Sequence, residues 1–168
     1  DDPKLAKLVE KLGLQALRDL SGMRKKEGAL LAQDLLSRLK AIGALKQQVA
    51  ERAPFVSQES FVRMKERVKK LLNGEIPDIP RLHQELAVYA DRGDITEELV
   101  RLDAHMVQFQ QIVHSAQPAG KTLDFLIQEM GREINTIGSK ASDATIAAAV
   151  VQMKAELERI REQVQNVE

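Results

Sequence analysis

The sequence predicts an all-α protein, in which a long helical arm or hairpin is followed by a C-terminal multi-helix bundle. Composition is the first observation: 43% of the 168 residues are hydrophobic and 30% are charged, with only nine Gly and five Pro, which is typical of long amphipathic helices. The second is that apolar residues recur at steps of three and four over most of the chain, the period of one helical face. The third is that the main interruptions of this pattern contain Pro or Gly, which end helices.

Residues 1–73 form the predicted arm. An apolar stripe opens it, with Gly13 as a weak break between two short helical pieces. From Ser21 to Asn73 the periodicity is nearly continuous, which predicts one long helix or two collinear helices. Pro54 lacks a backbone donor and clashes with the preceding turn, so we expect a kink, a helix break or a hairpin tip there. The apolar positions of the arm are Leu5, Leu8, Leu12, Leu17, Leu30, Leu31, Leu35, Leu39, Ile42, Leu45, Val49, Phe61, Met64, Val68, Leu71 and Leu72.

A linker over residues 74–80 separates the arm from the bundle predicted over residues 81–168. The linker carries Pro77 and Pro80 and cannot continue a helix. Beyond it, a short helix is predicted to stop near Gly93. Asp94 is a suitable N-cap for the next helix, with Glu97 placed to bond back to it.

Three further helices complete the predicted bundle. The first runs to about Ser115, before a turn at Pro118, and the second ends or loosens near Gly138. The third begins at a Ser142 or Asp143 cap and carries a heptad seam to the C-terminus, which predicts packing against another helix or another subunit. The apolar faces of the three helices are, in order, Ile95, Leu99, Leu102, Met106, Phe109 and Val113; Leu123, Leu126, Ile127, Met130, Ile134 and Ile137; and Ile146, Val150, Met153, Leu157, Ile160, Val164 and Val167.

Composition also limits the classes of function. The formal net charge is zero, so a polyanionic partner has to be bound by local clusters of Lys and Arg. The chain has no Cys, which excludes disulfides, thiolate metal sites and a Cys nucleophile and agrees with a cytoplasmic location. No apolar run is long enough to span a bilayer, and the first residues have neither an initiator Met nor a signal-peptide pattern. We therefore expect a chain that begins inside a longer one and does not enter a membrane.

Two predicted helices carry polar faces on which chemistry is possible. Glu97, Arg101 and His105 are spaced by four residues, with Glu98 beside them, and the next helix carries Glu129 and Glu133, also four apart. Carboxylates with an imidazole suit Mg²⁺ or Mn²⁺, and such an ion can polarise a scissile phosphate and activate water. Arg132 or Lys140 can neutralise charge that develops on phosphoryl oxygens. The alternative is that these residues form solvated ion pairs on helix surfaces.

Basic clusters lie on the arm. They are Arg24, Lys25 and Lys26 in the first half, and Arg63, Lys65, Arg67, Lys69 and Lys70 in the second. Either they form a solvated outer face, since Glu residues are interleaved, or they bind RNA phosphates. The five aromatic residues, Phe55, Phe61, Tyr89, Phe109 and Phe125, are scattered along the sequence. No stacking platform is evident from their spacing, so RNA bound here is expected to be held by its phosphates and shape.

Three blocks of the second half resemble one known family. They read ADRGDITEELVRL at residues 90–102 with His105; GKTLDFLIQEM at 120–130 with REINTIGSK at 132–140; and Lys154 with REQVQNVE at 161–168. In order and spacing these blocks are similar to the C-terminal region of the YicC/YloC endoribonucleases, over residues 80–168. Residues 1–73 are similar to the helical middle of that family, and its N-terminal domain is missing from this chain. The chain departs from the family pattern at Gly131, where Asn is usual.

The resemblance implies a metal-dependent endoribonuclease that hydrolyses RNA phosphodiester bonds and assembles as a ring-like homo-oligomer. On the two polar helix faces, the candidate catalytic residues are His105, Glu129, Arg132 and Glu133, and the candidate ligands of a divalent Mg²⁺ or Mn²⁺ ion are Glu98, His105, Glu129 and Glu133. Arg24, Lys25, Arg63, Arg67, Lys70 and Lys140 are the candidate RNA-binding residues. Two readings without catalysis stay open, a helical oligomerisation or adaptor module and an RNA-binding module. We expect convergence of the carboxylates and His105 on one concave site if the chain is enzymatic.

Overall fold

The computed structural model describes residues 3–71, 79–115 and 119–165, which form five α-helices and contain no strand. In chain order these are α1 (Pro3–Leu71), α2 (Ile79–Gly93), α3 (Thr96–Val113), α4 (Gly120–Lys140) and α5 (Ala144–Val164). The predicted all-α class is confirmed. Most of the predicted linker, the turn at Pro118 and Val167 at the end of the heptad seam lie outside the described residues.

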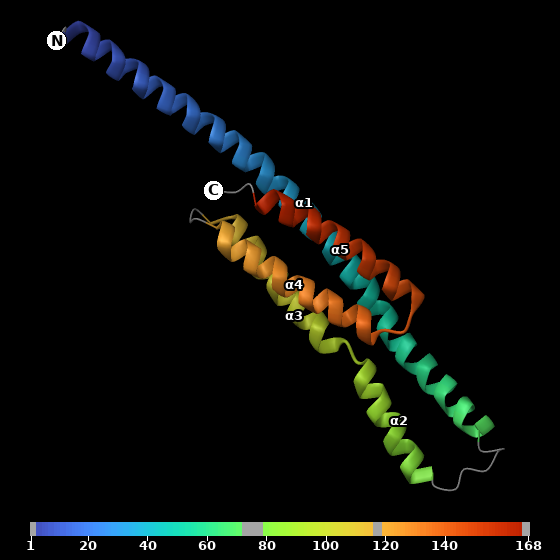
Figure 1. The fold of residues 1–168 in the computed structure, drawn as a ribbon. Helices are drawn as coiled ribbons and strands as arrows, with labels where there is room; N and C mark the ends of the chain where they lie inside the picture. The colour runs from blue at the N-terminus through green and yellow to red at the C-terminus, as the bar shows by residue number, and fades with distance from the viewer. Residues whose placement is uncertain (1–2, 72–78, 116–118, 166–168) are drawn as a thin grey trace.

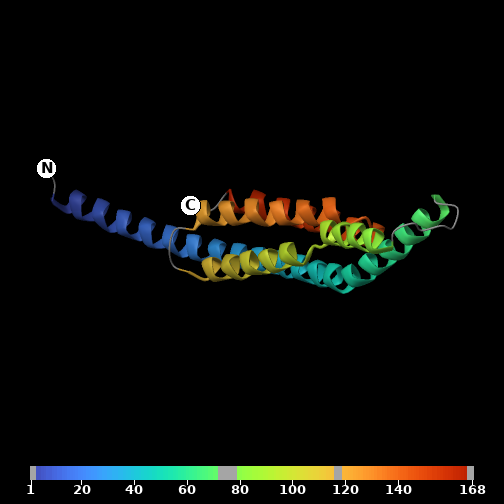
Figure 2. The ribbon, with the colours of Figure 1, turned by 90° about the horizontal axis from the view of Figure 1, so that it is seen from below.

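The helix α1 is a single element of 69 residues, which makes it about 100 Å long. It runs through Gly13 and Pro54 without interruption, so the expected break at Gly13 does not occur and the chain does not turn back at Pro54. Figure 2 shows that its axis bends where the colour passes from teal to green, and an internal proline removes one backbone hydrogen bond in the stretch around it. Figure 1 shows that both ends of α1 extend beyond α3, α4 and α5, and that α2 lies beside its C-terminal end.

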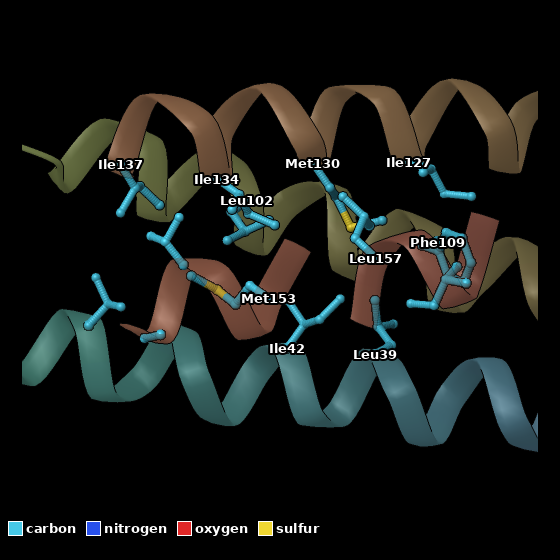
Figure 3. Packing of buried hydrophobic residues seen from close by; sticks show 14 of the residues in the cluster. Leu39, Ile42, Leu102, Phe109, Ile127, Met130, Ile134, Ile137, Met153 and Leu157 are labelled. Carbon is cyan, nitrogen blue, oxygen red and sulfur yellow. The ribbon is translucent and has the colours of Figure 1, made fainter. Parts of the chain in front are cut away.

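The middle of α1 packs with α3, α4 and α5 around one hydrophobic core (Figure 3). On α4 the six predicted apolar positions from Leu123 to Ile137 are all buried, since each lies on the same face of the helix. The helix α1 supplies Leu35, Leu39, Ile42 and Val49. The arm and the bundle therefore share a core, although the outer parts of α1 are exposed.

The heptad helix α5 lies directly against α1 in this core. Its seam from Ile146 to Val164 is buried at every described heptad position, which confirms the predicted packing against another helix. The N-cap is Asp143, whose side chain accepts a hydrogen bond from the Ile146 backbone N–H at 3.0 Å. The same carboxylate accepts from Arg52 of α1 at 2.9 Å, so one residue starts α5 and fixes it to α1.

The short helix α2 lies beside the second half of α1 and leads into α3. Asp94, in the turn between them, accepts hydrogen bonds from the Thr96 backbone N–H at 2.8 Å and from the Thr96 hydroxyl at 2.6 Å. The predicted capping box with Glu97 is wrong, because α3 begins at Thr96 and the N-cap position is Ile95. Glu97 instead pairs with Arg101.

Within the described ranges, no helix combines the length and the apolar character that crossing a bilayer requires.

Candidate functional site

The helices α3 and α4 present polar residues side by side, and these residues form the charged face. On α3 they are Glu97, Glu98, Arg101 and His105, and on α4 they are Glu129, Arg132, Glu133 and Lys140. The two helices are antiparallel, since the start of α3 meets the end of α4 through Glu98 and Lys140. All of the predicted catalytic and metal-binding residues belong to this face.

Glu98 is the most buried polar residue of the charged face. Its side chain is 4% exposed, and its Oε1 atom accepts a hydrogen bond from Lys140 Nζ at 2.9 Å. Lys140 also donates to the Asp94 carbonyl oxygen at 3.0 Å. The Oε2 atom of Glu98 is buried and has no hydrogen-bond partner within the part of the chain that is described. One carboxylate oxygen of Glu98 thus has a hydrogen-bond partner and the other has none, and an unsatisfied oxygen of a buried charge lowers stability.

Arg101 lies among three carboxylates and joins the two helices. Its guanidinium nitrogens are 3.0 Å from Glu97 Oε1, 3.7 Å from Glu98 Oε1 and 3.3 Å from Glu133 Oε1. The first two contacts follow from the spacing along α3, whereas the contact with Glu133 crosses to α4. Arg101 therefore brings Glu98 and Glu133 into one network with Lys140.

The remaining residues of the charged face lie one helical turn further along. Glu129 pairs with Arg132 at 2.5 Å, and the Arg132 side chain is 72% exposed. Because the helices are antiparallel, a step of four residues along each from the Arg101–Glu133 contact places His105 at the level of Glu129. His105 is partly buried.

The turn before α3 holds the cationic end of this network in place. Hydrogen bonds from the Thr96 hydroxyl and backbone N–H lower the pKa of the Asp94 carboxyl below its ordinary value, and the positive charge of Lys140 lowers it further. Asp94 is thus held ionised next to the residue that pairs with Glu98. The turn, α3 and α4 form one electrostatic unit.

The donor chemistry of the charged face suits a hard divalent cation, and Glu98 Oε2 is an unsatisfied oxygen of that type. The geometry does not form a metal site in this side-chain arrangement. Among residues 3–71, 79–115 and 119–165, no three His, Asp or Glu side chains come together as ligands of one ion. The guanidinium of Arg101 lies between Glu98 and Glu133, where an ion bridging these carboxylates would have to be.

A cavity of about 290 Å³ lies next to the charged face. Of that face it is lined by Lys140, but not by Glu98, His105, Glu129 or Glu133. The structure therefore brings Glu98, Glu133 and Lys140 together through Arg101, and leaves Glu129 paired with Arg132 on the surface. The expected concave site for all four metal-ligand candidates is not formed by these residues.

The candidate RNA-binding cations of α1 lie far from one another. Arg63 is 3.7 Å from Glu59 and donates to the Ser60 hydroxyl, and Arg67 and Lys70 are exposed on the same part of the helix. Arg24 and Lys25 are exposed in the first half. At a rise of about 1.5 Å per residue, the two groups are about 60 Å apart along the helix, so only an extended or sizeable RNA can reach both.

Two features of this region were not predicted from the sequence. The pairing of Arg101 with Glu133 depends on the register between α3 and α4. The four-residue spacing in the sequence indicates which residues share a face of one helix, but not which residues meet across two helices. The second feature is that Phe61 of α1 and Tyr89 of α2 line the same cavity. No sequence signal links these two aromatic residues, since they belong to different helices.

The sequence is similar to those of known proteins. Residues 49–168 match the family model described as endoribonuclease YicC-like, C-terminal. The chain is 40% identical over 169 aligned positions to a probable endoribonuclease YicC of Clostridioides difficile (strain 630), covering all of this chain and 58% of the relative. It is 36% identical over 152 positions to a probable endoribonuclease YicC of Haemophilus influenzae, covering 90% of this chain and 52% of the relative. The chain thus spans little more than half the length of these relatives.

Proposed function

We propose, because the chain belongs to the YicC-like endoribonuclease family, that it is the part of an endoribonuclease that cleaves RNA phosphodiester bonds at the charged face of α3 and α4. Membership rests on the match of the family model to residues 49–168, and the relatives are named as probable endoribonucleases. The observation that supports this location is the Arg101–Glu133 contact at 3.3 Å. It joins α3, which carries the end of the first family block, to α4, which carries the second.

In this proposal the cations of the charged face bind the phosphodiester group. Arg132 is the most exposed of them, and a guanidinium can donate two parallel hydrogen bonds to phosphate oxygens. Lys140 lies at the opposite end of the face and supplies a second positive charge. Cations fixed in this way stabilise the negative charge that develops on the phosphoryl oxygens during cleavage.

Proton transfer is assigned to His105, Glu129 and Glu133. A carboxylate can accept a proton, and an imidazole can both accept and donate one near neutral pH. The side chains of Glu129 and Glu133 remain 20% and 12% exposed. Arg101 acts as a positioning residue, since it holds Glu133 while it contacts Glu97 and Glu98. His105 has three alternative roles: ligand of a divalent ion, general acid or base, or a group that orients a carboxylate.

A divalent ion, Mg²⁺ or Mn²⁺, is proposed as a requirement for cleavage. The charged face carries four carboxylates, those of Glu97, Glu98, Glu129 and Glu133, against three cations. An RNA phosphate placed there meets an excess of negative charge, which a divalent ion offsets. When bound, the ion would supply charge neutralisation and a more acidic water. Glu98, Glu129, Glu133 and His105 are its proposed ligands, and for them to hold the ion the Arg101 guanidinium would have to leave Glu98 and Glu133.

RNA binding outside the charged face is assigned to the basic arm, defined as Arg63, Arg67 and Lys70 of α1. These residues step by four and three, so they share one face of the helix. Arg24 and Lys25 are proposed to bind the same RNA where it extends along α1. Contacts of this kind hold phosphates without reading the sequence. We also propose a cytoplasmic location, in keeping with RNA as the proposed substrate.

A homo-oligomer is proposed from the first part of α1, which extends beyond the bundle (Figure 1). Its large apolar side chains form the N-terminal apolar stripe, in which each residue is at least half exposed: Leu8, Val9, Leu12, Leu14, Leu17, Leu20 and Met23. An isolated amphipathic helix is marginally stable in water, and covering such a stripe with a second copy stabilises it. The same observation favours the second candidate function, an oligomerisation module without catalysis.

The experiment that tests the proposed function is cleavage of end-labelled RNA by the intact protein that contains this chain. We expect defined internal cuts that require Mn²⁺ or Mg²⁺, disappear with EDTA and return when the ion is added in excess. Internal cleavage that continues unchanged in EDTA would remove the ion from the proposal. Binding of RNA with no internal cleavage under any of these conditions would favour the non-catalytic alternative.

A further inference from the structure

The aromatic pocket is the cavity of about 290 Å³ between the second half of α1, the helix α2 and the connection from α4 to α5. Its inner wall is apolar and includes Val56, Leu86, Ile95 and Ile146, which are at most 9% exposed. The volume is at the small end of ligand pockets in proteins, so one small planar group fits better than a long chain. The carboxylates of the charged face do not line the pocket, but Lys140 belongs to both.

Two aromatic side chains line the pocket from different helices. They are Phe61 of α1 and Tyr89 of α2, which are 40% and 42% exposed. Aromatic residues left half exposed at a cavity offer flat apolar surfaces on which a planar ring can stack. Nucleobases are the planar rings of RNA, and single-stranded RNA is commonly recognised when an unpaired base stacks on Phe or Tyr.

The polar groups of the pocket favour a ligand that is negatively charged and has hydrogen-bond donors and acceptors. No Asp or Glu is among the lining residues, whereas Arg92 and Lys140 are, although Asp and Glu together are as numerous as Lys and Arg in the whole chain. Hydroxyl groups also line the pocket, including those of Ser57, Ser60 and Ser142. A purely apolar guest such as an acyl chain would leave these hydroxyls without partners. A nucleotide has a flat base with donors and acceptors and an anionic phosphate, and it matches all three properties.

We propose that the aromatic pocket holds one unpaired nucleobase of RNA against Phe61 and Tyr89, with the adjoining phosphate at Arg92 and Lys140. This inference rests on the proposed function, since it names the part of the RNA that the site recognises. Lys140 donates a hydrogen bond to Glu98 of the charged face at 2.9 Å. A base in the pocket therefore holds the neighbouring phosphodiester bond close to that face. Because a paired base cannot enter the pocket, the protein selects unpaired nucleotides near the bond that it cleaves.

The single tyrosine of the chain provides a direct probe, because Tyr89 is the only one present. A chain labelled with fluorotyrosine gives one fluorine NMR signal, which a base stacked on the ring shifts through its ring current. The probes are the four nucleoside monophosphates, with ribose 5-phosphate as the control that has the phosphate but no base. We expect saturable shifts with the nucleotides and none with ribose 5-phosphate. Equal shifts with ribose 5-phosphate would reduce the pocket to an anion site and overturn the proposal.

Variants test whether the second ring takes part. Phe61→Ala and Phe61→Leu are expected to weaken nucleotide binding about tenfold or more, because stacking on an aromatic face is lost in both. Phe125→Ala is the matched control, since Phe125 is 57% exposed on α4 and does not line the pocket. Helix content by circular dichroism checks that each variant folds. Unchanged affinity in both Phe61 variants would overturn the proposal.

Failure of this inference is distinguishable from failure of the proposed function. RNA binding is measured separately by the fluorescence anisotropy of a labelled single strand, and RNA cleavage by its products. If the protein binds and cleaves RNA while millimolar nucleotides leave the Tyr89 signal unshifted, the pocket assignment is wrong and the proposed function stands. The same unshifted signal with neither RNA binding nor cleavage contradicts both.

Discussion

Replacing Lys140 with Met removes the closest cation from the buried carboxylate of Glu98, and we expect the free energy of unfolding to fall by about 3 kcal/mol. The Glu98 side chain is 4% exposed, its Oε2 atom already lacks a hydrogen-bond partner, and Oε1 loses its bond to Lys140. Removing one partner of a buried pair costs about 3–5 kcal/mol. The lower end applies because Arg101 stays 3.7 Å from Glu98 and the Lys140 side chain is 31% exposed.

The double variant Glu98→Leu with Lys140→Met separates a stranded charge from lost packing. It removes both charges together, so most of the stability lost in Lys140→Met should return. Arg161→Met is the surface control, because Arg161 and Glu158 are 3.9 Å apart and their side chains are 47% and 63% exposed. We expect less than about 1 kcal/mol there.

The assay is urea unfolding of the four proteins followed by far-UV circular dichroism, with the slope of each transition compared. The reasoning is refuted if Lys140→Met loses no more stability than Arg161→Met. It is refuted in a different way if the double variant is no more stable than Lys140→Met, since the loss would then not come from the uncompensated carboxylate.

Three further predictions concern the rest of the molecule. Asp143→Ala should lower the free energy of unfolding by about 2 kcal/mol, because it removes the N-cap of α5 and the ion pair with Arg52. Asp143→Asn should lower it by about half of that, because Asn can still cap the helix. Hydrogen bonds from Arg52 and the Ile146 N–H lower the pKa of Asp143 in the folded state. The stability that Asp143 contributes is therefore complete above the ordinary carboxyl pKa of about 4 and is lost as the pH falls through the lowered value. A stability difference between wild type and Asp143→Ala that does not shrink in acid would contradict this. Reversing the three charges of the basic arm should weaken RNA binding and reduce the slope of log affinity against log salt by about 0.7 for each lost phosphate contact, and an unchanged slope would count against the arm. Replacing three leucines of the N-terminal apolar stripe with Gln should lower the mass measured by light scattering at micromolar concentration. A wild-type protein that is already monomeric at this concentration would contradict the proposed homo-oligomer.

The helices of the bundle could be predicted closely because their apolar faces repeat at the helical period. The heptad positions of α5 and the apolar face of α4 are buried as expected, and the Asp143 cap is one of the two residues predicted to start α5. Along α1 local signals were misleading. Gly13 lowers helix propensity by about 1 kcal/mol relative to Ala, which did not end the helix, and Leu30 is 69% exposed although it continues the stripe. Periodicity identifies an apolar face but not what covers it.

The charged face could be predicted only in part. Spacing by four residues placed Glu129 and Glu133 on one face of α4 and Arg101 on the polar face of α3. Which residues meet across the two helices depends on their register, and core packing by Leu102, Phe109 and Met130 sets that register. The convergence of Phe61 and Tyr89 depends in the same way on how α2 packs against α1, which no local pattern specifies.

Cleavage of labelled RNA by Glu129→Gln and Glu133→Gln variants of the intact protein, at saturating Mn²⁺, tests most directly whether the charged face carries the chemistry. Removing a carboxylate that moves a proton or holds the ion should lower the rate about a hundredfold or more, with little change in helix content. Glu158→Gln is the matched control, since Glu158 lies on α5 with its side chain 63% exposed, and its rate should equal that of the wild type. Rates within about twofold of wild type for both Glu129→Gln and Glu133→Gln would contradict the account, because the bond would then be cleaved somewhere other than at the charged face.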